Sequence, residues 1–448
     1  MTLLDNSPVF RLPNRLVDAR RWSRKKWAQL FSVYCVVAGG IGLATADTDV
    51  SPQDKLKQAY SELQTTRSQA LGTIVDSKLY RDFPHSRDDA YLFLLNLESA
   101  QTRFNQRYNN PEFPRYYWRG GIDNNWGFSN PDEQVLSARI SDRYAYQITG
   151  RLGTAKDVVF TSYKGERTER IAGEQLARKA IKVRRGNIDI VVSREKLKGR
   201  NWLPMQKGAT HLEIRQLFTD WGEQRSGVFR IRRIDLDNAQ SSVAMYPPVS
   251  PEHNSERATL EYISDLEVKM LDELEYWLGV SSRFAWIPEN YVAQARPSPT
   301  KITRRWLSPG RYKLSEDQAM IITFDKPSGA SYMGWSLYNI WGMALDYITR
   351  QTSLNNSQLR QDNDGRYRVV LSVKDPQLPN WLDISNYPDG YIMWRTDGVN
   401  QPEQPLVRVV DFASLRRHLP IETAVTLPEQ RISTIEERQK HNGYRLGH

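Results

Sequence analysis

The segment from residue 335 to residue 395 combines flat aromatic side chains with charged and amide side chains, and its polar residues are the best candidates for chemistry. Arginine can hold a carboxylate, sulfate or phosphate through two parallel hydrogen bonds, tryptophan can stack on a ring, and aspartate can accept hydroxyl protons. The candidate ligand-binding residues, which we call the Trp381 cluster, are Asp346, Arg350, Asn355, Asn380, Trp381, Asp383 and Arg395. Buried Arg/Asp pairs that fix loops between sheets would give the same pattern, so both interpretations stay open.

An enzyme hypothesis depends on the carboxylates of this cluster. Asp346 and Asp383 would act as general base and general acid if burial moved their pKa values apart. The sequence has no glycine-rich phosphate loop, and Gly329 to Met333 lacks the second glycine of a nucleophile elbow. The enzyme alternative is therefore a metal-independent hydrolase, lyase or transferase, with no catalytic residue assigned.

The sequence predicts no cofactor and no metal site. The six histidines are far apart along the chain, and none has a second histidine at helical spacing. The only cysteine, Cys35, lies in an apolar stretch near the N-terminus, so a mature chain would have no disulfide. Asp362 to Gly365 lacks the twelve-residue ligand pattern of an EF-hand, and this segment predicts a hairpin turn instead.

Several motifs closely resemble the bacterial family called domain of unknown function 1214. They are Trp341 to Asn355, Asp362 to Gly365, Asp375-Pro376, Asn380 to Asp383, Gly390 and Arg395, and upstream Asn130 to Asp132, Ala138 to Ile140, Tyr146 to Gly150 and Thr219 to Trp221. The upstream motifs are similar to the longer members, although Ser129 stands where those proteins carry an aspartate. The resemblance covers about residues 120 to 430. It implies two β-sandwich-type domains with helical additions and an exported or envelope-associated protein, and it brings no settled activity.

Short alternating runs bounded by turn residues predict the strands. The predicted strands are Tyr144 to Thr149, Asp157 to Tyr163, Asn187 to Ser193, His211 to Trp221, Val228 to Ile234, Ala319 to Phe324, Tyr332 to Trp341, Tyr367 to Val373, Tyr391 to Thr396 and Leu406 to Asp411. Between the two groups, apolar residues every three or four positions predict a helix from about Glu256 to Leu278. The expected fold is mainly β with α additions: two β-sandwich-like domains joined by a long helix and preceded by a small helical region.

This pattern divides the chain into six expected parts. They are residues 1–46 as a signal peptide or signal anchor, 47–125 as an N-terminal helical region, 126–255 as the first β domain, 256–305 as a helical segment and linker, 306–428 as the second β domain, and 429–448 as a polar tail. In the helical region, Leu92, Leu95 and Phe104 are expected to share one face of a helix that begins near Ser86. Asp364-Gly365 and Asp389-Gly390 are expected to form hairpin turns.

The N-terminus has the layout of an export signal. Basic residues at 20–26 precede an apolar stretch at 27–43, and Ala44-Thr45-Ala46 matches the small residues that a signal peptidase requires. We expect cleavage after Ala46 and a periplasmic or secreted protein. The alternative is an uncleaved anchor, in which residues 27–46 would be the contact with the inner membrane.

The charge distribution argues against a nucleic-acid partner. The formal net charge is +10, but without the seven basic and two acidic residues of positions 1–46 it falls to +5, with no long basic stripe. The sequence therefore predicts an exported or envelope-associated protein that binds a carbohydrate, lipid or steroid-like ligand through the Trp381 cluster. A structural assembly module is a further alternative, and the sequence does not define the oligomeric state.

Overall fold

The computed structural model describes residues 51–121, 125–166, 170–196, 200–234, 256–298, 305–384 and 387–446. The predicted export signal, residues 1–46, lies outside them, so its cleavage and anchoring stay predictions. Among the described residues, no helix has both the length and the apolar character needed to cross a membrane. Residues 52–448 form one unit by their contacts.

The chain of this unit begins with helices α2 (Pro52–Val75), α3 (Lys78–Asp82) and α4 (Arg87–Arg107), with a short 3-10 helix η1 (Pro84–Ser86) before α4. Pro52 stands in the first turn of α2, where its missing N–H costs nothing. The buried stripe of α4 consists of Ala90, Phe93, Leu97, Gln101 and Phe104. The expectation that Leu92 and Leu95 share a face with Phe104 was wrong: both are exposed, because the three-and-four spacing that ends at Phe104 starts from Ala90 and Phe93.

The first β domain consists of two packed sheets. The strand order in one sheet is β1 (Tyr117–Arg119), β2 (Glu133–Arg139), β8 (Ala209–Leu217), β4 (Asp157–Lys164) and β5 (Ile171–Ala177). In the other sheet it is β7 (Asn201–Pro204), β6 (Ile188–Ser193), β3 (Ala145–Arg151) and β9 (Val228–Ile234), and the 3-10 helix η4 (Arg178–Ala180) follows β5. Phe160 and Ile214 from the first sheet and Ile148 and Ile190 from the second belong to one buried apolar core.

The second β domain repeats this two-sheet plan. One sheet has the order β10 (Tyr291–Val292), β12 (Trp306–Lys313), β18 (Asp389–Asp397), β14 (Tyr332–Tyr338) and β15 (Ser353–Asn355), with β11 (Arg296–Pro297) also paired to β12. The other has the order β17 (Trp381–Asp383), β16 (Arg366–Ser372), β13 (Gln318–Asp325) and β19 (Leu406–Asp411), and the 3-10 helix η6 (Phe412–His418) follows it. Trp335 and Trp394 stack in its core with ring centroids 5.3 Å apart.

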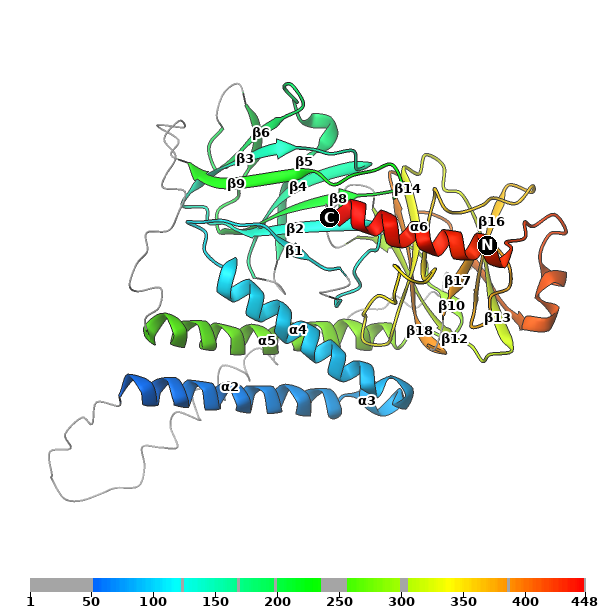
Figure 1. Ribbon diagram of the computed structural model, residues 1–448, viewed down its shortest axis with the longest axis horizontal. Coiled ribbons are helices and arrows are strands. Elements are labelled where there is room, and N and C mark those ends of the chain that lie inside the picture. The colour runs from blue at the N-terminus through cyan, green and yellow to red at the C-terminus, as the bar shows by residue number, and fades with distance from the viewer. Residues whose placement is uncertain are drawn as a thin grey trace, which may run out of the picture. The chain divides into compact units, whose positions relative to one another are not determined.

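These elements confirm the expected fold class: two β-sandwich-like domains, a long helix between them in the sequence, and a helical region before them (Figure 1). The long helix is α5 (Glu256–Phe284), and it runs beside α2. Leu63 of α2 packs against Ile263 and Leu266 of α5. The apolar spacing that predicted this helix is therefore the spacing of its buried side chains.

The linker that was expected to end at residue 305 is followed by β12, in which Pro309 lacks an N–H while its carbonyl oxygen accepts a hydrogen bond from Ala293. One of the two expected hairpin turns was wrong. Asp389-Gly390 begins β18 and is not a hairpin turn; Gly390 is required there because a Cβ would lie 2.4 Å from the Tyr312 hydroxyl. The turn at Asp364-Gly365 is confirmed, with Gly365 at a φ of +82°.

The expected polar tail contains an ordered helix, α6 (Pro428–Leu446). Arg431, Arg438 and Arg445 recur every seven residues and so share one helical face. Arg438 donates to the carbonyl oxygens of Tyr347 (2.9 Å) and Ser353 (3.2 Å), and burial lowers its pKa to about 10. This cationic face attaches α6 to backbone carbonyls of the β domains.

Gly150 of β3 provides a test of how closely the strands of the first domain approach. Its φ is +147°, and a Cβ would lie 1.9 Å from the carbonyl oxygen of Val228 in β9. We expect Gly150→Ala to lower the free energy of unfolding by about 1–3 kcal/mol from backbone strain alone, with the steric overlap adding to it.

Urea unfolding of Gly150→Ala checks this, with Gly279→Ala as the matched control. No atom lies within 4 Å of the added Cβ at Gly279 in α5, so this change should stabilise the protein by about 0.5–1 kcal/mol. Equal stability of Gly150→Ala and wild type would contradict the close approach.

Candidate functional site

The outer face of the β1-β2-β8-β4-β5 sheet is polar, yet it is buried. Alternate residues of a strand point to opposite faces, so Leu212 and Ile214 of β8 face the apolar core while His211, Glu213 and Arg215 face outward. His211 and Glu213 are nevertheless only 4% and 1% exposed. The Phe104 ring of α4 stacks on the His211 ring, with centroids 6.2 Å apart. A helix therefore covers a face that in a simple sandwich would be solvated.

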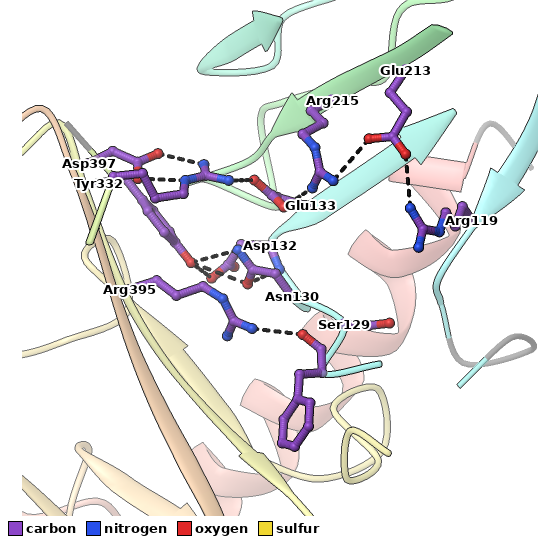
Figure 2. Close-up of polar contacts among 12 residues, drawn as sticks. Arg119, Ser129, Asn130, Asp132, Glu133, Glu213, Arg215, Tyr332, Arg395 and Asp397 are labelled. Carbon is purple, nitrogen blue, oxygen red and sulfur yellow. Dashed lines mark hydrogen bonds and ion pairs between the residues drawn. The ribbon is translucent and has the colours of Figure 1, made fainter. Parts of the chain in front are cut away.

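Glu213 is the centre of this buried face. It accepts hydrogen bonds from Arg119 of β1 (2.9 Å), from Arg170 (2.7 Å) and from Arg215 (3.0 Å). Burial alone would raise the pKa of Glu213, but Arg170, Arg215 and Arg119 together outweigh it and hold that pKa well below its usual range. Three guanidinium groups therefore share one carboxylate, and Figure 2 shows two of them.

Buried polar atoms without partners surround Glu213. Ser137 and Thr161 lie directly opposite it on the neighbouring strands β2 and β4. The hydroxyl oxygens of both residues, and Nε of Arg215, are buried and make no hydrogen bond within the described ranges. Native proteins leave few buried polar groups unsatisfied. Such a concentration marks this face as a place where a bound molecule or water would complete the hydrogen bonding.

A cavity of about 240 Å³, which we call the α4 cavity, lies between the C-terminal half of α4 and this face of the sheet. Its charged and polar lining includes Arg119, Arg170 and His211. Its aromatic lining consists of Phe104, Tyr108, Tyr117, Trp118 and Trp126. Nε and Nη2 of Arg170, and Nε1 of Trp126, are buried and have no hydrogen-bond partner among the residues that the structure describes.

His211 adds a neutral polar group to the cavity. Burial, and then the charges of Arg170 and Arg139, lower the pKa of His211 well below its usual range. Nδ1 lies 3.0 Å from the Thr210 hydroxyl, and Nε2 lies 3.4 Å from Nη1 of Arg139. Because arginine can only donate, Nε2 accepts and the ring proton is on Nδ1. The positive charge at the cavity therefore comes from arginines alone.

Ion pairs connect this face to the second β domain (Figure 2). Arg215 contacts Glu133 of β2 at 3.4 Å, and Glu133 also pairs with Arg305. Arg305 precedes β12 and donates from Nε (2.7 Å) and Nη2 (2.6 Å) to the carboxylate of Asp397 at the end of β18. The two domains are thus joined by buried charges that begin at the α4 cavity.

Asp132 forms a second polar junction between the domains. Its carboxylate accepts hydrogen bonds from Trp221 Nε1 (2.8 Å), the Tyr332 hydroxyl (2.8 Å) and Asn355 Nδ2 (2.7 Å). Burial raises the pKa of Asp132, and these three donors and the charge of Arg445 only partly oppose that effect. With three side-chain donors already bound, this carboxylate serves to join the domains.

The structure brings the Trp381 cluster together only in part. Asn355 and Arg395 flank Gly334 on either side of β14. Arg395 donates to the hydroxyls of Ser336 and Tyr338 and to the carbonyl oxygen of Phe128. This pair therefore belongs to the junction with the first domain.

The other members lie on or near β17. Asn380 donates to the carbonyl oxygens of Arg360 and Arg368, and Trp381 donates from Nε1 to the carbonyl oxygen of Ser372 at 3.1 Å. Arg350 and Asp383 form an ion pair at 2.9 Å. The last three residues of the segment 380–383 form a strand because β16 pairs with them in parallel.

Asp346 stands apart from both groups. It lies in the loop between β14 and β15, not at a strand end, because β14 stops at Tyr338. Its Oδ1 accepts from the backbone N–H groups of Ile348 and Thr349. Asn380 also lines an open hollow of about 660 Å³ between α6 and the segments before β15 and β17. These positions neither establish nor remove a ligand site, so the assignment stays a prediction.

Sequence reasoning missed Arg119, Arg170, His211 and Glu213. The pattern His211-Leu212-Glu213-Ile214-Arg215 reads as an ordinary strand with one face in water. The signal that could have found these residues is the stripe of α4 that ends at Gln101 and Phe104. A helix face of this composition has to pack against another element, and here both side chains are buried.

Neither a family model nor a curated protein matches the chain. A solved structure described as a putative uncharacterized protein from Burkholderia cenocepacia is similar to it, with a TM-score of 0.71 and 22% identity over 81% of this chain and 100% of that one. A protein from Vibrio parahaemolyticus matches with a TM-score of 0.41 and 12% identity, over 72% of this chain and 98% of that one.

The first of these likenesses concerns the fold. The chain shares its fold with an uncharacterised bacterial protein over that protein's whole length. At this level of identity the likeness shows the fold alone, and it carries no activity.

Proposed function

We propose that this protein binds a small organic anion in the α4 cavity. The observation that carries the proposal is Arg170, which lines the cavity and gives only one nitrogen to Glu213. Its two other nitrogens are buried and have no partner in the described part of the chain. Leaving buried donors unsatisfied costs about 1–3 kcal/mol, and more for charged groups. An anion placed between Arg170 and the aromatic walls would recover that free energy.

The proposal keeps the ligand-binding class expected from the sequence and moves the site to the first β domain. Binding of a carbohydrate, lipid or steroid-like ligand by the Trp381 cluster stays a separate proposal, supported by the aromatic and polar composition of that segment. The metal-independent hydrolase, lyase or transferase stays an alternative, and no geometry favours it.

Two further proposals rest on the sequence alone. Membership in the domain of unknown function 1214 family is supported by the motifs around Trp341 and Trp381. A periplasmic or secreted location is supported by the basic and apolar segment that ends in Ala44-Thr45-Ala46.

Calorimetric titration with a panel of organic carboxylates, sulfonates and phosphate monoesters, each with a neutral analogue, tests the proposed function. At least one anion should bind, and saturation at a hundred times its dissociation constant should stabilise the protein by about 2.7 kcal/mol. Arg119→Gln should weaken that binding at least tenfold. Arg311→Gln is the matched control, because Arg311 also pairs with a buried carboxylate, Asp389, outside the cavity lining.

Two results would overturn the proposal. One is the absence of binding by every anion of the panel. The other is binding that Trp381→Ala abolishes and Arg119→Gln leaves intact, since this would place the site in the Trp381 cluster.

A further inference from the structure

We infer that the ligand of the α4 cavity is a monocyclic aromatic carboxylate, held by the Nε and Nη2 edge of Arg170 with its ring between the aromatic walls. This inference rests on the proposed function and narrows it to one chemical class.

The free edge of Arg170 has the geometry that binds carboxylates. The Nε–H and Nη2–H groups of a guanidinium point the same way and match the two oxygens of a carboxylate. Arg305 uses this edge on Asp397 at 2.7 and 2.6 Å, and Arg311 uses it on Asp389 at 3.1 and 2.8 Å. Arg170 binds Glu213 through Nη1, so its Nε and Nη2 edge is left without a partner among the described residues.

The surroundings favour a single negative charge over two. Phe104 and Tyr108 belong to the C-terminal turn of α4, where the helix dipole is negative. The carboxylate of Glu213 is within hydrogen-bond distance of both Arg119 and Arg170, and Glu273 of α5 also acts electrostatically on Arg119. His211 is neutral and adds no positive charge. A carboxylate monoanion therefore fits better than a phosphate dianion.

The walls and the volume indicate one flat ring. Tyr117 lies 5.0 Å from Phe104 and 5.5 Å from Tyr108 between ring centroids, which gives aromatic surface on the α4 side of the cavity. Arg119 stacks 5.6 Å from the Trp126 ring centroid on the other side. Pockets for drug-sized ligands measure about 300–1,000 Å³. At about 240 Å³ the α4 cavity is below that range and has room for a single ring with its carboxylate.

The free Nε1–H of Trp126 adds a detail to this ligand. A buried indole donor normally finds an acceptor. A hydroxyl group on the ring, away from the carboxylate, would provide one. A hydroxybenzoate should therefore bind more tightly than benzoate, and Trp126→Phe should remove that difference.

The test is titration calorimetry on the full chain with benzoate, 4-hydroxybenzoate, benzyl alcohol, phenyl phosphate and acetate. The two benzoates should bind, and each of the other three compounds should bind at least tenfold more weakly than benzoate. Arg170→Lys keeps the charge but loses the two-pronged edge, so it should weaken benzoate binding at least tenfold. Arg311→Lys, which loses the same edge at Asp389, should leave the affinity unchanged.

The outcomes separate this inference from the proposed function. Tighter binding of phenyl phosphate than of benzoate, or an unchanged affinity in Arg170→Lys, overturns the carboxylate assignment and keeps the anion site. Failure of every anion to bind overturns both. To separate lost binding from lost structure, the melting temperature and near-ultraviolet circular dichroism of Arg170→Lys are measured beside those of Arg311→Lys. Folded Arg170→Lys with lost binding supports the inference. If it is not folded, benzoate quenching of the tryptophan fluorescence, compared between wild type and Trp126→Phe, decides whether benzoate enters the cavity.

Discussion

Glu213→Gln should lower the free energy of unfolding by about 3–5 kcal/mol, because it removes one partner of a buried ion-pair group and leaves the others uncompensated. Glu213 is 1% exposed and is the carboxylate shared by Arg119, Arg170 and Arg215. A glutamine has one acceptor oxygen in place of two, and its amide group would face guanidinium donors. Urea unfolding monitored by tryptophan fluorescence measures the loss.

Glu289→Gln is the matched control for this change. Glu289 also contacts two cations, Arg311 at 3.3 Å and Lys313 at 3.1 Å, but its side chain is 45% exposed. Exposed ion pairs contribute about 0–1 kcal/mol, so this variant should stay close to wild type. Similar free energies of unfolding for Glu213→Gln and Glu289→Gln would show that burial does not increase the contribution of the Glu213 ion pairs to stability.

The loss of stability at acidic pH should depend on the same residue, Glu213. The pKa of Glu213 is well below its usual value in the folded protein, so the unfolded chain binds its proton at higher pH. The stabilisation is complete above about pH 4.3, the ordinary glutamate value, and is lost progressively as the pH falls below it. In Glu213→Gln, the free energy of unfolding should therefore depend less steeply on pH in this acidic range.

The sequence predicted the fold better than the site because the fold depends on local periodicity. The strand around Ile214 alternates apolar and polar residues, the strands around Phe160, Ile321 and Trp394 contain short apolar runs, and the long helix has apolar residues every three or four positions. Short strands such as β17 carry too few residues to show a period, and they exist because a neighbouring strand pairs with them.

The candidate site was missed because it depends on which face of a sheet a helix covers. The sequence of β8 fixes that Glu213 and Arg215 share a face, but not that α4 shields this face from water. Arg119 and Arg170 come from strands and loops distant in sequence, and only the sheet order places them beside Glu213. The Trp381 cluster, in contrast, stands out in sequence because its residues are close along the chain, and closeness along the chain does not require a shared pocket.

Arg305→Met should be as damaging as the Glu213 change, although it lies at the other end of the same set of ion pairs. Arg305 is 5% exposed and joins Glu133 of the first β domain to Asp397 of the second. Removing it leaves two buried carboxylates without this cation, and breaking a buried pair costs about 3–5 kcal/mol. Urea unfolding should show this loss.

Two further variants test whether the effect of Arg305→Met comes from the loss of a buried charge. Lys374→Met removes a cation from an exposed pair with Asp317, whose side chain is 91% exposed, and should change stability by about 0–1 kcal/mol. Adding Glu133→Gln and Asp397→Asn to Arg305→Met removes the stranded charges. This triple variant should recover part of the lost stability, because replacing a whole buried ion pair is often close to neutral. A triple variant no more stable than Arg305→Met would mean that the packing of the arginine side chain, and not its charge, holds the two β domains together.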